Sequence, residues 1–217
     1  MRRRSTLTSV AAALLGTDPA RAQPGSPLAS PPARGSGRRG IPGARNLDHV
    51  GLVVPDLEQA VRFFVDLLGA EELFRFDEGP GTENPADLHQ VFDVDPRSRL
   101  RIAMLRLGPT VNIELLEYAA PEQRREMPRN SDVDAPHLAF WVEDMDVAAA
   151  YLAAHGCTLL GGPFTSKDGP KAGQSIRYAR TPWGLSIEIL HRPAHMPYEQ
   201  GTVARLFGPA ASWSNAP

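Results

Sequence analysis

Two histidines and two glutamates occupy matched places in two copies of an internal repeat. His49 and His137 each stand near the start of a short apolar run, and an aspartate follows each histidine by seven residues, at Asp56 and Asp144. A segment with helical periodicity comes next in both copies. Because internal self-similarity marks repeated structural units, the sequence predicts two half-domains that each contribute one histidine and one glutamate.

The last apolar segment of each copy carries one of the glutamates, Glu114 or Glu188. Side chains alternate across a β-strand, so the apolar neighbours can cover a helix while the carboxylate points to the opposite face. Burying a carboxylate is costly unless it is paired or bound to a metal. Two imidazoles and two carboxylates suit one divalent metal ion, such as Zn, Ni, Co, Mn or Fe. The predicted metal ligands are His49, Glu114, His137 and Glu188.

Each of these four residues also has an ordinary structural explanation. A single histidine in a strand is most often a core residue with satisfied hydrogen bonds, and a single glutamate often lies on a solvated face. The same two residue types recur at corresponding places in both copies, and this repetition favours the metal site.

Hydrophobic periodicity predicts the order strand, helix, strand, strand, strand in both copies. Asp56 and Asp144 are the predicted N-caps of the two helices. The predicted strands are 47–54, 72–76, 100–107, 110–118, 136–142, 158–160, 175–180 and 185–190, and the predicted helices are 57–68 and 145–155. The core-facing residues predicted for the second helix are Val147, Ala148, Tyr151 and Leu152.

With these residues and elements, the sequence resembles the vicinal oxygen chelate superfamily, which includes glyoxalase I, methylmalonyl-CoA epimerase, fosfomycin-resistance proteins and extradiol dioxygenases. The resemblance implies an α+β fold in which two paired βαβββ modules form one open barrel-like cup. It covers residues 46–191, with module 1 at 46–119 and module 2 at 135–191, and leaves a C-terminal tail at 192–217. It also implies that the first and last strands of each module supply the metal ligands.

The complete set of two histidines and two glutamates is similar to that of glyoxalase I. This resemblance implies a lyase or isomerase that acts on a small oxygen-chelating substrate through an enolate-like intermediate, with Glu114 and Glu188 as catalytic acid and base. One alternative is an extradiol-type ring-cleaving dioxygenase, with Fe(II) held by His49, His137 and Glu188. Another alternative is a non-catalytic protein that binds a ligand or confers resistance.

Three further residues are candidates for substrate contact, although packing explains each of them equally well. Tyr118 shares a strand face with Glu114, and Tyr178 and Arg180 share a face of the strand before Glu188. Cys157 is the only cysteine, which excludes an internal disulfide and a cysteine-rich zinc site. The apolar neighbours of Cys157 predict a small buried side chain.

Charge is distributed unevenly along the chain. The formal net charge of −2 combines a sum of +7 over residues 1–46 with a sum of −9 over residues 47–217. Because binding to nucleic acid depends on Lys and Arg near the phosphates, so acidic a folded region argues against a nucleic-acid partner. We expect a small-molecule substrate as the partner, and a homodimer is compatible with the superfamily.

Residues 1–22 have the features of an export signal. Arginines at positions 2–4 precede an apolar stretch at 7–16, and Ala20 and Ala22 fit a small-x-small cleavage site. The apolar stretch is too short to cross a membrane, and the consecutive arginines also suit a twin-arginine signal. We therefore expect a periplasmic or secreted protein with no membrane anchor, although a disordered tail and a mitochondrial transit peptide remain alternatives. The Pro-, Gly- and Arg-rich residues 23–45 are expected to form a flexible linker.

Overall fold

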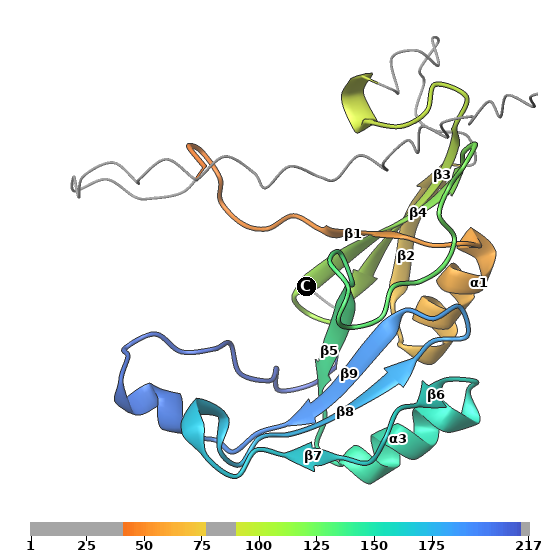
Figure 1. Cartoon of the computed structure of the whole chain (residues 1–217). Coiled ribbons are helices and arrows are strands. Elements are labelled where there is room, and N and C mark those ends of the chain that lie inside the picture. Colours follow the sequence, from red (N-terminus) through yellow and green to blue (C-terminus); the bar gives the residue numbers. More distant parts are fainter. Residues whose placement is uncertain (1–40, 77–89, 214–217) are drawn as a thin grey trace, which may run out of the picture. The chain divides into compact units, whose positions relative to one another are not determined.

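Two β-sheets, each accompanied by its own helix, make up the folded part of the chain (Figure 1). The computed structural model describes residues 41–76 and 90–213. The chain divides into two units at residue 44, and all the elements below belong to the second unit, residues 45–217. The predicted export signal, most of the predicted linker and residues 77–89 lie outside the described residues.

Module 1 forms the first sheet, in the strand order β1-β4-β3-β2. β1 pairs with β4 in parallel, and the remaining pairs are antiparallel. Its elements are β1 (Val50–Val53), α1 (Leu57–Arg62), the π-helical turn η1 (Phe63–Leu67), β2 (Glu71–Phe76), β3 (Arg99–Leu107) and β4 (Val111–Ala119). The predicted helix over 57–68 is thus confirmed in position, but its second half widens into η1, where the Leu68 backbone N–H donates to the Phe63 carbonyl at 3.2 Å.

Module 2 repeats this arrangement in the strand order β5-β9-β8-β6, with the short β7 also paired to β8. Its elements are β5 (His137–Trp141), α3 (Met145–Ala154), β6 (Thr158–Leu159), β7 (Phe164–Thr165), the 3₁₀ turn η2 (Gly169–Lys171), β8 (Ser175–Arg180) and β9 (Ser186–His191), followed by a second 3₁₀ turn, η3 (Pro197–Gln200). β5 and β9 are parallel, as β1 and β4 are. The predicted α+β fold of two βαβββ-like modules is confirmed, and β7 is an addition that the sequence did not predict.

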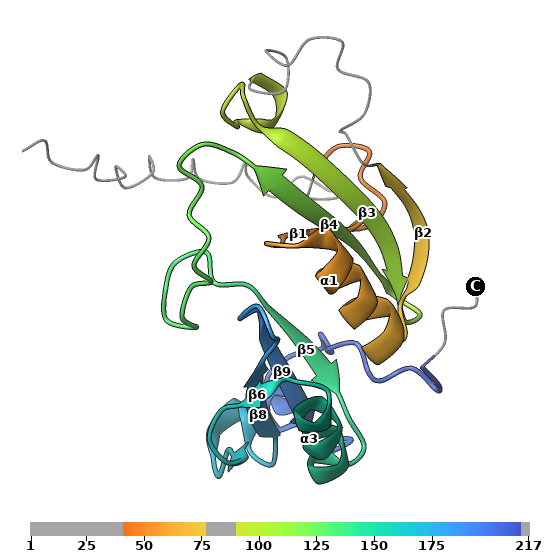
Figure 2. The same cartoon turned by 90° about the vertical axis from the view of Figure 1, so that its right-hand side faces the viewer.

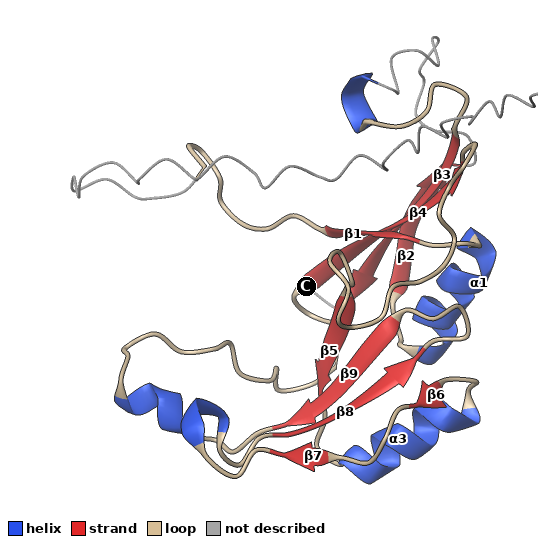
Figure 3. Ribbon diagram, viewed as in Figure 1, coloured by secondary structure: helices blue, strands red, loops and turns tan. Residues whose placement is uncertain are grey.

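Both helices begin at the predicted aspartates. The Asp56 carboxylate accepts from the backbone N–H of Gln59, and the Asp144 carboxylate accepts from those of Asp146 and Val147. These bonds satisfy amide groups that lack partners within the first helical turn. The caps fix where each chain segment turns from its first strand into its helix, so α1 and α3 lie against equivalent faces of the two sheets, as Figures 2 and 3 show.

The core lies between each helix and the inward face of its sheet. In module 1, Leu57 and Phe64 from α1 and η1 are buried against Ile113 and Leu115 of β4. In module 2, the buried residues are Ala149, Leu152, Ile187 and Ile189. Cys157 is buried, as its apolar setting predicts. Since alternate residues of β4 and β9 face this core, the residues between them, including both glutamates, are left on the other face.

The predicted core face of α3 was partly wrong. Val147 is 65% exposed and Tyr151 is 44% exposed, whereas Ala149 is buried with Leu152. The sequence of α3 has small or apolar residues at almost every position, so its periodicity does not fix which side faces inward. Tyr151 nevertheless has a structural contact, because its hydroxyl donates to the Leu67 carbonyl at 3.0 Å.

Among the described residues, the structure contains no helix that is both long and apolar enough to cross a membrane.

Candidate metal and active site

The two predicted ligands of module 1 lie next to each other on the face of the sheet that the helix does not cover. His49 precedes β1, and its Nε2 atom lies 3.4 Å from the Glu114 Oε2 atom on β4. The second ring nitrogen, Nδ1, lies 2.8 Å from the Asp48 carboxylate. A proton on Nδ1 donated to Asp48 leaves the Nε2 lone pair directed at the Glu114 side, which is the usual arrangement behind a metal-binding histidine.

The two predicted ligands of module 2 form the equivalent pair. His137 begins β5, and its Nε2 atom lies 3.3 Å from the Glu188 Oε2 atom on β9. The Tyr178 hydroxyl donates to the same Oε2 atom at 2.8 Å. Burial and this bond to the carboxylate raise the pKa of Tyr178 to about 12, so the hydroxyl keeps its proton and remains a donor at neutral pH.

The two carboxylates differ in burial. The Glu188 side chain is 10% exposed and that of Glu114 is 24% exposed. Among the described residues, no Lys or Arg forms an ion pair with either carboxylate. A buried carboxylate that faces only an imidazole and a hydroxyl is unfavourable unless a cation neutralises it.

The donor atoms in each pair therefore fit a divalent metal ion. Imidazole nitrogen and carboxylate oxygen suit Zn, Ni, Co, Mn and Fe, and the two donor atoms lie 3.4 Å apart in module 1 and 3.3 Å apart in module 2. Within residues 41–76 and 90–213, however, no group of three or more His, Cys, Asp and Glu side chains is close enough to hold a metal. The structure brings the four predicted ligands together as two pairs, and one site made of all four stays a prediction.

A cavity of about 240 Å³ lies along β1 of module 1. It is lined by residues 51–55, by residues 123–128 of the segment that connects the modules, and by Asp134 and Pro136. A Cβ atom at Gly51 would lie 3.8 Å from Glu114 Oε2, which places this wall of the cavity beside the carboxylate. Within the described part of the chain, the buried Gln123 Oε1 atom has no hydrogen-bond donor.

With the fold and these pairs established, a comparison with protein families is decisive. Residues 48–178 match the family described as "Glyoxalase/Bleomycin resistance protein/Dioxygenase superfamily". The chain belongs to this superfamily. The match begins one residue before His49 and includes both first strands, so the resemblance inferred from the repeat is confirmed.

Two individual proteins are similar to this chain. A "2-epi-5-epi-valiolone epimerase" from Actinomyces sp is 49% identical over 178 residues, which cover 82% of this chain and 96% of that protein. The crystal structure of a glyoxalase family protein from Bacillus cereus matches with a TM-score of 0.55 at 21% identity, covering 70% of this chain and 98% of the other. The first is a relative in sequence, and the second supports the superfamily fold alone.

The three candidates for substrate contact have different surroundings. Tyr178 bonds to Glu188, as described above. Arg180 donates from one guanidinium nitrogen to the carbonyls of Pro128, at 3.1 Å, and Gly184, at 2.7 Å. Burial and the negative charge of Glu114 raise the pKa of Tyr118. Arg180 therefore ties the connecting segment to module 2, and its role in substrate binding stays a prediction.

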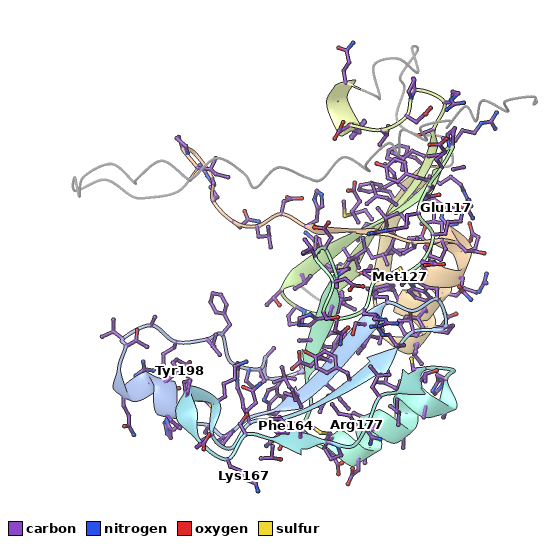
Figure 4. The ribbon with its side chains drawn as sticks, in the orientation of Figure 1. Glu117, Met127, Phe164, Lys167, Arg177 and Tyr198 are labelled. Carbon is purple, nitrogen blue, oxygen red and sulfur yellow. The ribbon has the colours of Figure 1, made fainter. Side chains whose placement is uncertain are left out.

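The connecting segment also packs onto module 2 at Met127, which Figure 4 labels between the two modules. A Cβ atom at Gly184 would lie 3.0 Å from the Met127 Cβ atom, so only glycine allows this close approach without a shift. The same turn has a positive φ of 97° at Gly184. Lys167, in the loop before η2, is exposed and points away from the sheet in Figure 4.

Sequence reasoning missed Asp48 as part of the site. The sequence contains a signal for it, because the Asp48 carboxylate directly precedes His49, the first residue that the two copies share. The second copy has Pro136 before His137, so a search restricted to features shared by both copies passes over Asp48. Repetition predicts only the residues that both copies share, and Asp48 has no counterpart in the second copy.

Proposed function

We propose that the protein is an epimerase that uses one divalent metal ion to invert a carbon next to the carbonyl of a small polyhydroxylated ketone. The observation that carries this proposal is the matched histidine–glutamate pair on the uncovered face of each sheet. The Actinomyces relative, named for epimerisation of a valiolone, supports an isomerase over the alternatives of a dioxygenase or a binding protein. It also supports a cyclic polyol ketone as the substrate class.

The chemistry of such a reaction needs a base and a polarised carbonyl. The C–H bond beside the carbonyl breaks, its proton goes to a base, and its electron pair moves toward the carbonyl oxygen. Return of a proton to the opposite face restores the C–H bond with inverted configuration. A divalent ion held by the two pairs would act as a Lewis acid toward the substrate oxygens, and Glu114 and Glu188 are the available proton carriers.

The cavity beside Glu114 provides a place for the hydroxyl groups of the ring. Gln123 and Asp134 line this cavity, and side chains of these two types form hydrogen bonds with hydroxyl groups. A polyol can donate hydrogen bonds to the Asp134 carboxylate, whereas an apolar ligand cannot.

The proposal is tested by NMR in D₂O with 2-epi-5-epi-valiolone as substrate. Protein stripped with a chelator and reloaded with Zn, Ni, Co, Mn or Fe(II) should form a second epimer that carries deuterium at the inverted carbon. H49Q and H137Q should lose this activity at least about 100-fold. H155Q is the matched control, because His155 lies at the end of α3, bonded to the Tyr151 carbonyl. Absence of both epimer and deuterium with every metal would overturn the proposal.

A further inference from the structure

The two glutamates face different residues across their sheets. Strand pairing places Tyr178 of β8 opposite Glu188 and Met104 of β3 opposite Glu114. These are equivalent positions of the repeat, since both lie on the third strand of a module next to the glutamate of the fourth. The two modules therefore share the glutamate but differ in the side chain opposite it.

In module 2 the carboxylate is held in place. Glu188 Oε2 receives the Tyr178 hydroxyl at 2.8 Å and lies 3.3 Å from His137 Nε2. The rings of His137 and Tyr178 meet edge to face, with centroids 5.8 Å apart. With one oxygen engaged twice and the side chain nearly buried, rotation of this carboxylate would break a hydrogen bond to a charged group.

Within the described part of the chain, the equivalent carboxylate of module 1 has no hydroxyl donor of this kind. The Met104 thioether cannot donate a hydrogen bond, and the residue paired with Glu114 on β1 is Gly51, whereas Ala139 is paired with Glu188 on β5. The absent Cβ atom at Gly51 leaves space beside Glu114 Oε2. The Glu114 carboxylate is therefore less restrained than that of Glu188, and its neighbour Gly51 lines the cavity.

We propose that the two carboxylates have unequal roles: Tyr178 is a positioning residue that fixes Glu188 as a permanent metal ligand, and Glu114 is the base that takes the substrate proton. This inference rests on the proposed function. A pre-oriented ligand binds a metal without losing side-chain freedom, whereas a base must move between the metal and the carbon.

The C–H bond breaks, an O–H bond forms on a Glu114 oxygen, and the electron pair moves toward the carbonyl oxygen. Water donates a proton to the opposite face of the same carbon, and the Glu114 proton passes to solvent and neutralises the hydroxide. Each turnover in D₂O therefore places one deuterium at the inverted carbon.

The tether is tested by calorimetric titration of the full-length protein with Co²⁺, without substrate. Y178F removes only the hydroxyl and should weaken binding about 10-fold, the usual size of an effect from a residue that orients a metal ligand. In an E188Q background, Y178F should add little further loss, because the two residues act as one unit. Unchanged affinity in Y178F, or full additivity with E188Q, would overturn the assignment of Tyr178.

The division of roles is tested by deuterium exchange at saturating Co²⁺. E114Q should abolish exchange by about 100-fold or more, while E188Q should recover much of its exchange once excess metal is supplied. M104Y places a hydroxyl opposite Glu114. This variant should have a lower kcat with little change in KM. M104F is its matched control without the hydroxyl. Equal losses in E114Q and E188Q at saturating metal, or equal kcat values for M104Y and M104F, would contradict the proposal.

The two proposals fail in different ways. If wild-type protein catalyses no exchange, the proposed function is wrong, and the Co²⁺ titrations of Y178F and E188Q still decide whether Tyr178 fixes a metal ligand. If wild-type protein is an epimerase but the variants behave alike, only the unequal roles are wrong.

Discussion

Module 1 and module 2 contain the same two predicted ligand types, one histidine and one glutamate. In module 1 a neighbouring side chain bonds to the histidine, whereas in module 2 a neighbouring side chain bonds to the glutamate. In module 1, the Asp48 carboxylate lies against the ring of His49, and Glu114 faces a methionine. In module 2, a proline precedes the histidine, and the Tyr178 hydroxyl holds Glu188. The histidine and glutamate of each pair are thus the same in both modules, whereas the residues that contact them differ. These different contacts distinguish the two carboxylates, although both belong to glutamates.

The modules also differ in how much apolar side chain their helices bury. Phe64, fully buried in module 1, corresponds to Leu152, 4% exposed, in module 2. F64A should lower the free energy of unfolding by about 3–5 kcal/mol and L152A by about 2–5 kcal/mol, because the larger truncation leaves the larger cavity. Urea denaturation measures both. A greater loss in L152A than in F64A would contradict this ranking of the two cores.

The helix caps give a smaller contrast. Asp144 accepts two backbone N–H bonds and Asp56 accepts one, while the Leu57 N–H in module 1 is bound by Glu117 instead. D144A should therefore destabilise the protein by about 1–2 kcal/mol and D56A by about 1 kcal/mol or less. Thermal denaturation of D144A, D56A and the side-chain-conserving controls D144N and D56N tests this order, and the asparagine variants should retain most of the stability.

Module 1 alone carries a network of ion pairs next to its helix, among the residues described. Arg75 bonds to Glu58 at 3.0 Å and to Glu72 at 2.6 Å, and Arg101 bonds to Glu58 at 2.7 Å. The hydrogen bonds from Arg75 lower the pKa of both glutamates from the usual 4.5. The groups are partly exposed, so solvent screening limits the loss in R75M to about 1 kcal/mol.

The pH dependence of R75M follows from the direction of these shifts. A carboxyl whose pKa is lowered by folding contributes stability that is complete above its unfolded-state pKa. That contribution is lost as the pH falls from 4.5 through the lowered folded-state pKa. The stability difference between wild type and R75M should therefore be full at pH 6 and shrink below pH 4.5. A difference that grows on acidification would contradict the assignment of these ion pairs.

Asp48 gives the smallest expected effect. Its side chain is 82% exposed, so its bond to His49 competes with water, and D48N should weaken Co²⁺ binding only about 3-fold. The same titration should show the roughly 10-fold loss in Y178F. A larger loss of Co²⁺ affinity in D48N than in Y178F would contradict this ranking. It would mean that Asp48 contributes more to metal binding than Tyr178 does.

The sequence by itself determined the elements and the pairs. Period-2 and period-3.6 patterns, with an aspartate at each helix start, predicted all but one strand and both helices. The alternation along β4 and β9 placed Glu114 and Glu188 away from the core, because only one face of each sheet is covered by a helix. The recurrence of one histidine and one glutamate in each copy then predicted which side chains would meet, and the superfamily followed from that pattern.

The contacts of each predicted ligand depend on the tertiary structure. Strand register, which depends on pairing across long stretches of chain, put Tyr178 opposite Glu188 and Met104 opposite Glu114. Packing of α3 turned Val147 outward and Ala149 inward, because a helix with apolar residues on every side takes its orientation from its neighbours. The cavity beside Glu114 likewise depends on the connecting segment, whose irregular sequence carries no periodic signal. Local patterns predict the elements, whereas contacts between distant segments decide that Glu188 receives a tyrosine hydroxyl and that Glu114 faces a methionine.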